Sequence, residues 1–496
     1  MDRGPSIFSD FGSDPARQVL IPVLVAVPLV LALIFGGPAY AAALVIIGIG
    51  GILFLANPRT FILTFLTVIS LRNFIAGGER IGSDSFNFDL GGLVNVLATG
   101  MGVVYFLVLW KNPFKGRSLT VPYGAFLLIF LVSMAWAPDF RWAIRFATRL
   151  GAPFFTYLII SDMLDRKMVQ QVIYAMYGSS VVPILYGFFQ WITGTGNDIT
   201  EGYNRVQSSF HHPAHFSMYL VYLFCLAYSE LLAERRANRV FLTGYIACLV
   251  ALEVATYTRI SWMAMLFCFV YLSWVYRKYS YILAGVMSGL VVLLGFGAGI
   301  ISRVTSVQDA LGSDNPYDLN TSVGWRLYFW DEILRRFWEA PWLGHGSGSS
   351  TILGIELFGT EASPHNGYLR VIYETGAVGS AAFLSVLGVM LYQGYRLVRS
   401  NLGPRVTFVS HVYITMTVTY IMLNMTDNIL EYYEVAIYHF AVLSLVEYAN
   451  LQAAKAGVIE ESYFEGELEP EEEVVEELKV LAEEPEAEAA DTIKLV

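Results

Sequence analysis

The chain has 496 residues, of which 55% are hydrophobic and 15% are charged, and its formal net charge is −11. Charged residues normally make up about a quarter of a soluble globular chain, so this composition excludes a disordered protein and disfavours an ordinary soluble enzyme. Together with a mean hydropathy of +0.53, it indicates a membrane protein.

The two ends of the chain differ from the rest. Residues 1–18 are polar and no small-residue cleavage site follows the first apolar run, so that run is predicted to be a retained span and not a signal peptide. Residues 457–496 contain fifteen Asp and Glu but two Lys, a balance of −13, so the remainder carries +2. Like charges repel, and residues 450–496 are therefore predicted to be an acidic, disordered or loosely helical tail.

Apolar stretches suited to crossing a membrane recur along the chain. A helix crosses ~30 Å of hydrocarbon with about 20 mainly apolar residues. Fourteen stretches qualify, the second, third, ninth and tenth least clearly, and they lie near residues 19–36, 38–56, 60–76, 90–110, 121–137, 142–161, 169–193, 214–233, 240–257, 260–275, 280–302, 376–395, 406–425 and 433–449. We predict an all-α polytopic membrane protein with about 14 (12–14) transmembrane helices and one long outer loop containing amphipathic helices.

The positions of Lys and Arg in the short connections predict the orientation. If residues 1–18 are cytoplasmic, every predicted inner connection carries positive charge. Helices 1–11 then occupy residues 19–302, a long periplasmic loop occupies 303–375, and helices 12–14 occupy 376–449. This topology places both termini in the cytoplasm and the long loop outside the inner membrane of a bacterium.

Arginines on the outer side are unusual under this rule and need a reason to be there. Arg141, Arg145 and Arg149 are spaced four apart at the outer end of the sixth span, so a helix would place them on one face. Guanidinium groups bind phosphate oxygens in pairs, so these residues can bind a phosphate. Protein carboxylates and lipid headgroup phosphates are alternative partners.

Arg259 lies at the tight turn between the ninth and tenth spans. A charge at this depth normally faces a cavity or a partner. Two interpretations stay open: a structural ion pair with Glu253, or an anion ligand that reaches into a central cavity.

The long loop begins with a predicted amphipathic helix over residues 322–338, which includes Arg326 and many aromatic side chains. Aromatic residues at this density are typical of the membrane surface, so we expect this helix to lie on the bilayer. The Gly-rich segment that follows, residues 341–348, allows close backbone approach to a ligand.

Histidines near the outer side are the candidate proton acceptors. An imidazole with a pKa near 6.5 takes a proton at neutral pH, so His365 is the best candidate general base, although a loop histidine is often just a polar surface residue. His211, His212 and His215 are expected to line the same cavity, because no familiar metal-ligand spacing joins them to nearby carboxylates. No metal site is predicted.

Remaining groups have simpler expected roles. Cys225, Cys248 and Cys268 lie scattered in apolar stretches, which is typical of packing residues. Acidic residues at the last outer turn can neutralise some of the arginines; these are Asp427, Glu431 and Glu434.

The motifs of the long loop resemble a known family. They are Pro341-Trp342-Leu343-Gly344-His345-Gly346, Pro364-His365-Asn366 and Glu374-Thr375-Gly376-Ala377-Val378-Gly379, with Thr258-Arg259 and residues 205–215 upstream. Together they resemble the O-antigen polymerase and ligase superfamily of membrane glycosyltransferases, over roughly residues 140–450.

This resemblance implies a function and a set of partners. Such enzymes move a glycan from an undecaprenyl-pyrophosphate carrier to an acceptor glycan, either a lipid-linked chain or the lipid A core, by an inverting displacement. Metal ions and cofactors are not expected to take part, and nucleic acid is not an expected partner, whereas membrane lipids are. The span count favours a polymerase slightly over a ligase. Alternatives are a protein O-oligosaccharyltransferase and a transporter of a small anion.

The resemblance also implies site residues. His365 matches the loop histidine that activates the acceptor hydroxyl, while Arg259 and Arg326 match the arginines that hold pyrophosphate. Further candidates for the pyrophosphate are Arg205, Arg145 and Arg149, and candidates to assist the base or the acceptor are Asn366, His345, His212 and Glu374. A glycosidase pair of carboxylates is not evident around His365, which argues against hydrolysis.

Overall fold

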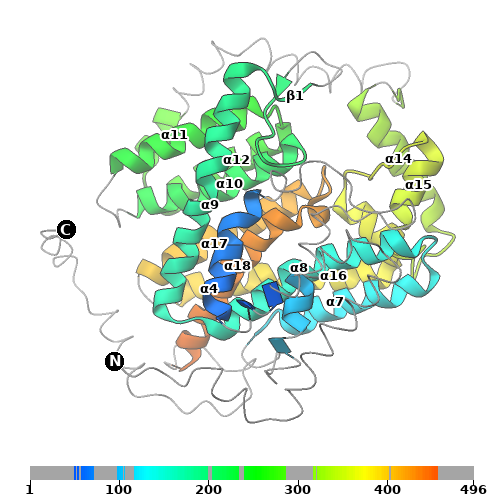
Figure 1. Cartoon of the computed structure of the whole chain (residues 1–496), viewed down its shortest axis with the longest axis horizontal. Coiled ribbons are helices and arrows are strands. Elements are labelled where there is room, and N and C mark those ends of the chain that lie inside the picture. Colours follow the sequence, from blue (N-terminus) through cyan, green and yellow to red (C-terminus); the bar gives the residue numbers. More distant parts are fainter. Residues whose placement is uncertain are drawn as a thin grey trace, which may run out of the picture.

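The computed structural model describes residues 57–71, 117–198, 204–233, 239–285, 317–319, 321–400 and 404–455, with parts of 50–54 and 98–106. The described part is mostly helical, with α14 and α15 at one end of the molecule (Figure 1). The predicted N-terminal segment, the first span at 19–36 and the acidic tail from residue 456 lie outside the described residues. Most of each predicted span at 38–56, 90–110 and 280–302 also lies outside the described residues.

The elements follow the predicted apolar stretches closely. They are α4 (Pro58–Val68), η1 (Ile69–Leu71), α7 (Thr120–Ser133), η2 (Met134–Trp136), α8 (Phe140–Met163), α9 (Arg166–Thr193), β1 (Asn197–Asp198), β2 (Asn204–Arg205), α10 (Pro213–Leu232), α11 (Arg239–Ala255), α12 (Arg259–Val275), α14 (Ser322–Phe337), α15 (Ser349–Phe358), α16 (Gly367–Arg399), α17 (Pro404–Leu423), η3 (Ile429–Glu431) and α18 (Tyr433–Lys455). Among the described residues, the short antiparallel strands β1 and β2 are the exception to the all-helical fold that we predicted.

Four of the described helices are long and apolar enough to cross a membrane. They cover Lys167–Thr193, Pro213–Leu232, Gly367–Arg399 and Val406–Leu423. A polytopic membrane protein is consistent with this finding, and the number of about fourteen spans stays a prediction.

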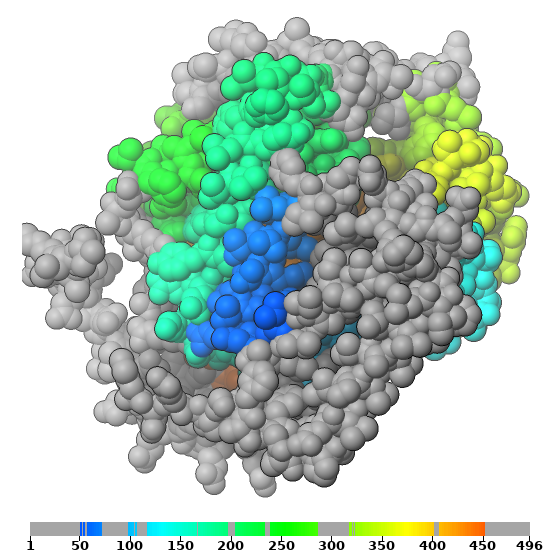
Figure 2. Space-filling view, viewed as in Figure 1, coloured from blue at the N-terminus to red at the C-terminus, as the bar shows by residue number. Residues whose placement is uncertain are grey.

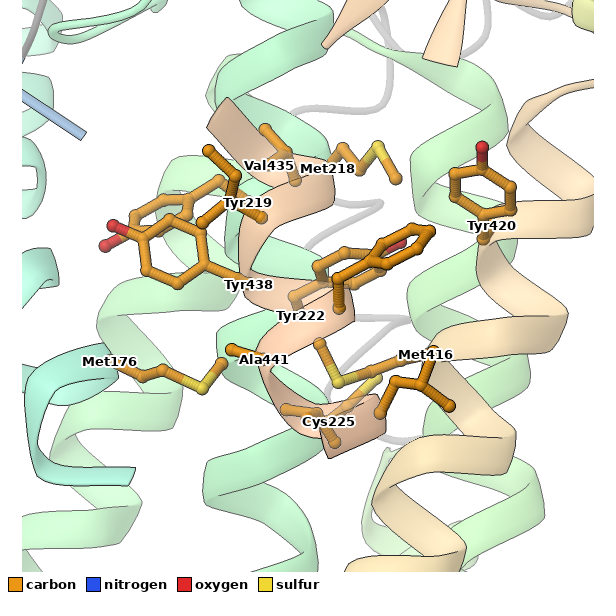
Figure 3. Close-up of a cluster of buried hydrophobic side chains, with 14 of the residues drawn as sticks. Met176, Met218, Tyr219, Tyr222, Cys225, Met416, Tyr420, Val435, Tyr438 and Ala441 are labelled. Atoms are coloured by element: carbon orange, nitrogen blue, oxygen red, sulfur yellow. The ribbon is translucent and has the colours of Figure 1, made fainter. Parts of the chain in front are cut away.

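The centre of the bundle is α10, which packs against α11, α12, α17 and α18. Its apolar window is buried along its whole length. Figure 3 shows Tyr219 of α10 beside Tyr438 of α18, with ring centroids 5.3 Å apart. Their hydroxyls bond inside the protein, Tyr219 with Ser179 Oγ and Tyr438 with the Leu66 carbonyl oxygen, at 2.7 and 2.8 Å. Satisfied polar groups are what a close-packed membrane bundle requires.

Peripheral helices surround this centre. Figures 1 and 2 show α4 and α9 side by side on one face of the molecule. Arg59 in the first turn of α4 links the two helices, because it donates to Asp165, the N-cap of α9, at 2.6 Å and to Gln171 of α9 at 3.0 Å. The thiols are consistent with packing: Cys225 and Cys268 are buried and free.

The long helix α16 is broken at Gly376, and the break joins it to the Gly-rich segment. Gly376 has a φ of 62° and a ψ of −160°, a conformation that a residue with a Cβ avoids. The N–H groups of Ala377 and Val378 therefore donate to the carbonyls of Pro341 and Trp342, at 2.8 and 3.2 Å. In return, N–H groups of the segment 345–346 donate to carbonyls of the first half of α16. Two of the recognised motifs thus pair with each other.

Helix α14 buries its apolar face against the protein. Phe329 and Ile333 are fully buried and form a small core with Leu353 of α15 and Tyr373 of α16. These contacts show that part of the apolar face packs inside the protein, and the expected position of the helix on the bilayer stays a prediction. Because α15 and α16 cover this face, only its C-terminal end keeps a large exposed aromatic side chain, Trp338.

Candidate functional site

The predicted base, His365, has a carboxylate partner. Nδ1 of His365 lies 3.0 Å from Oδ1 of Asp427, at the turn between α17 and η3. Because a carboxylate accepts and does not donate, it holds the imidazole with a proton on Nδ1 and leaves the Nε2 lone pair of the neutral ring available. This is the arrangement in which a histidine acts as a general base.

The backbone around His365 is held firmly in place. His365 has a φ of 48°, which is uncommon for a residue with a side chain. Asn366 caps α16 through its side-chain oxygen, and its Nδ2 donates to the Met425 carbonyl at 2.9 Å. The Gly367 N–H donates to the Asn424 carbonyl at 2.8 Å. These bonds fasten the loop to the end of α17, which explains how the uncommon conformation persists.

Trp325 contacts the His365 ring and is the neighbour of Arg326 in the sequence. Trp325 of α14 packs edge-to-face against the His365 ring, with centroids 5.5 Å apart. Arg326 follows Trp325 directly in the helix. The amphipathic helix therefore supplies both the aromatic contact of the histidine and a neighbouring positive charge.

Two further arginines converge from other elements. Arg205 of β2 donates to the Thr256 carbonyl and to Thr258 Oγ1, at 2.6 and 2.9 Å, and Thr258 directly precedes Arg259. Burial lowers the pKa of Arg205 to about 10, and the charges of Arg326 and Arg259 add to this effect. The three guanidiniums, which we call the arginine cluster, are thus close enough to repel one another. A bound polyanion would relieve that repulsion.

The charge of Asp427 offsets part of this repulsion. Burial acts to raise the pKa of Asp427, but the hydrogen bond and charge of His365, together with the charge of Arg326, hold it well below its usual range. A depressed pKa means that ionised Asp427 stabilises the fold above its unfolded value of about 3.9, and that this contribution is lost as the pH falls below that value. Asp427 is therefore ionised at neutral pH.

Asp427→Asn is expected to lower turnover by about 10²- to 10⁴-fold, because an amide can hold the imidazole in the wrong tautomer. The measurement is glycan transfer, the activity that the family resemblance implies, by the purified variant, with its melting temperature checked alongside. Asp139→Asn is the matched control, since Asp139 lies in a pair with exposed Arg141 and Asn also caps helices well. Equal activity of the two variants would contradict a role for Asp427.

His212 also lies at the arginine cluster. It caps α10, and its charge would interact with those of Asp427, Arg205 and His365. Burial lowers the pKa of His212 to about 3, so the ring is neutral at physiological pH. His212 can therefore donate or accept a hydrogen bond here without adding charge.

Arg149 contacts a carboxylate of the protein. It donates to Glu431 at 3.0 Å, so one of the acidic residues expected to neutralise arginines does pair with an arginine. Glu431 also accepts from Ser363 at 2.7 Å and pairs with Arg370. Arg145 instead stacks over the Trp142 ring, 4.7 Å from its centroid. A pyrophosphate-binding role for Arg145 and Arg149 stays a prediction.

Glu374 and His345 serve the structure of the loop. Glu374 is fully buried and accepts from the Gly348 N–H at 2.9 Å and from Ser350 Oγ at 2.5 Å, and it pairs with Arg370 at 3.0 Å. The His345 ring stacks on Tyr373, with centroids 4.4 Å apart. Both residues have contacts that shape the loop, and a direct role in chemistry stays a prediction for each.

Arg370→Ala is expected to destabilise the protein by about 3–5 kcal/mol, because it leaves Glu374 buried without its charged partner. Arg370 is 3% exposed and Glu374 is 0% exposed, so water cannot replace the lost contact. Thermal unfolding of the detergent-solubilised protein measures the effect. Arg141→Ala removes an exposed arginine, whose side chain is 58% exposed, and should leave the melting temperature unchanged.

Sequence reasoning missed that Asp427 pairs with His365, that Glu434 pairs with His215 and that Trp325 contacts His365. The signals present were the position of Asp427 and Glu434 at the last outer turn and the position of Trp325 beside Arg326. Among the described residues, no group of three or more His, Cys, Asp or Glu is arranged to hold a metal ion.

The fold and the site define a class: a helical membrane protein with a histidine–carboxylate pair beside clustered arginines. Residues 244–384 match a protein family described as O-antigen ligase. The matched region runs from α11 into α16 and includes Arg259, Arg326 and His365. This match confirms the resemblance to the O-antigen polymerase and ligase superfamily, although Arg205 and Asp427 lie outside it. A search of curated proteins found no match.

Proposed function

We propose that this protein moves a glycan from an undecaprenyl-pyrophosphate carrier to a hydroxyl of an acceptor glycan. The observation that carries the proposal is the His365–Asp427 pair, 3.0 Å apart, next to the arginine cluster. The anion that such a transfer releases is undecaprenyl pyrophosphate, whose phosphate groups suit the arginine cluster. The family match supports the same type of enzyme.

In the proposed step, the acceptor hydroxyl oxygen forms a bond to the anomeric carbon of the transferred sugar. The bond from that carbon to the pyrophosphate oxygen breaks, and its electron pair leaves with the pyrophosphate. Nε2 of His365 takes the hydroxyl proton, while Asp427 stabilises the imidazolium that forms. Attack opposite the leaving group inverts the anomeric centre.

The arginine cluster supplies the second half of the mechanism. Negative charge grows on the pyrophosphate as the glycosidic bond breaks, so fixed guanidiniums stabilise the transition state more than the ground state. Arg205 is held by two hydrogen bonds to the turn before α12 and therefore needs little reorganisation. We propose that Arg205, Arg259 and Arg326 bind the pyrophosphate, on the periplasmic side of the inner membrane.

Glycan analysis of a deletion strain tests the proposal and separates the two acceptor classes. A product capped with a single repeat indicates lost polymerisation, which is the result we favour from the predicted span count. Accumulated long lipid-linked chains would indicate lost ligation to a final acceptor such as the lipid A core. An unchanged glycan profile, with unchanged protein glycosylation, would contradict the proposed function.

A further inference from the structure

The hydrogen bonds of His212 define which of its nitrogens carries the proton. The backbone N–H of Ala214 donates to Nδ1 of His212 at 3.2 Å, as part of the cap of α10. An accepting Nδ1 has no proton, so the proton of the neutral ring is on Nε2. The low pKa of about 3 agrees with a neutral ring. His212 therefore offers a donor at Nε2.

His215 has the opposite arrangement. Its Nδ1 lies 2.9 Å from Oε1 of Glu434, which is in the first turn of α18, where the helix dipole favours an ionised carboxylate. Nδ1 of His215 therefore carries the proton that faces Glu434, which leaves Nε2 as the nitrogen that can accept a hydrogen bond. The ring of Tyr432 packs on that of His215, with centroids 3.5 Å apart, and fixes its plane.

The two rings are neighbours at the edge of the arginine cluster. Their centroids are 6.2 Å apart, and both side chains come from the start of α10. Tyr432 links them to the proposed base, because its hydroxyl donates to Asp427 Oδ1. A donor on His212 and an acceptor on His215 thus lie side by side, next to positive charges that suit a phosphate.

A sugar hydroxyl is the group that complements such a pair, since it accepts one hydrogen bond and donates another. We infer that His212 and His215 form a sugar-recognition subsite, in which His212 Nε2–H donates to a hydroxyl of the transferred sugar and His215 Nε2 accepts from it. This inference rests on the proposed function and deepens it, because two sets of residues then bind different parts of the lipid-linked donor. The arginines bind the pyrophosphate, and the two histidines bind a hydroxyl of the sugar attached to it.

Two carriers test the inference with the full-length protein in nanodiscs: bare undecaprenyl pyrophosphate and the glycosylated carrier extracted from the protein's own strain. His212→Asn removes the imidazole donor but keeps a helix cap, because Asn is a strong capping residue. His215→Phe keeps a ring against Tyr432 and removes both nitrogens. Each variant is expected to lose about tenfold in affinity for the glycosylated carrier, since a sugar hydroxyl loses its partner, and to bind the bare carrier as wild type does.

Arg335→Ala is the control, because the Arg335 side chain is 64% exposed and pairs with Glu332, so this variant should keep wild-type affinity for both carriers. Unchanged affinity of both histidine variants for the glycosylated carrier would overturn the inference. Equal loss for both carriers would overturn it too, since the histidines would then act on the pyrophosphate or on the fold. The proposed function fails separately, if Arg326→Ala binds the bare carrier as tightly as wild type.

Discussion

His365→Gln is expected to reduce glycan transfer by about 10²- to 10⁴-fold, the usual contribution of a general base. Glutamine is close in size and can still bond to Asp427, so the local hydrogen bond to the turn after α17 is kept. It cannot take a proton from the acceptor hydroxyl. The loss should therefore appear in turnover and leave the affinity for the lipid-linked donor unchanged.

The measurement is single-turnover transfer by the purified protein, at saturating donor and acceptor. The abundance of the variant in the membrane and its melting temperature are recorded alongside. His365 has a left-handed backbone conformation, so a general loss of folding must be separated from a loss of chemistry. A folded His365→Gln variant with full activity would show that His365 is not the base.

Arg259→Ala and Arg326→Ala are each expected to reduce transfer by about 10²- to 10³-fold, the usual cost of removing one group that stabilises transition-state charge. Arg326→Lys should recover part of the activity, because lysine keeps the charge but loses the planar fork. Both residues lie close enough to Arg205 to affect its pKa. We expect the three guanidiniums to act on one anion, so their effects should not add independently.

Arg335→Ala is the matched control for this series. Arg335 is on the same helix as Arg326, but its side chain is 64% exposed and pairs with Glu332. Transfer assays and the affinity for bare undecaprenyl pyrophosphate are compared across the variants. An Arg335→Ala loss as large as that of Arg326→Ala would mean that the helix, and not the arginine cluster, is what the substitutions disturb.

Local sequence was enough to predict most helix positions. Predicted spans at 240–257 and 260–275 correspond to α11 (Arg239–Ala255) and α12 (Arg259–Val275), with the short turn between them as expected. The reason is that an apolar stretch of this length forms a helix in lipid, where its backbone groups have no water to bond. The break of α16 at Gly376 was harder to predict, because it depends on the Gly-rich segment from another part of the chain that pairs with the helix there.

The site was only partly predictable for the same kind of reason. His365, Arg259 and Arg326 were found because their motifs resemble a known family, and they do lie in one region. The partner of His365 was not found, since Asp427 is 62 residues further along the chain. No local pattern distinguishes Asp427 from Glu431, yet one holds the histidine and the other pairs with Arg149.

The sequence by itself indicated the class of this protein: its apolar stretches are typical of a membrane protein, and its clustered arginines suit an anionic ligand. Tertiary structure decided which ionisable groups meet. It placed Arg205 and Arg326 together although they are far apart in the chain, and it gave Arg149 a carboxylate of the protein. The physical reason is that a charge removed from water needs a partner, and only the packing of distant helices determines which partner is within reach.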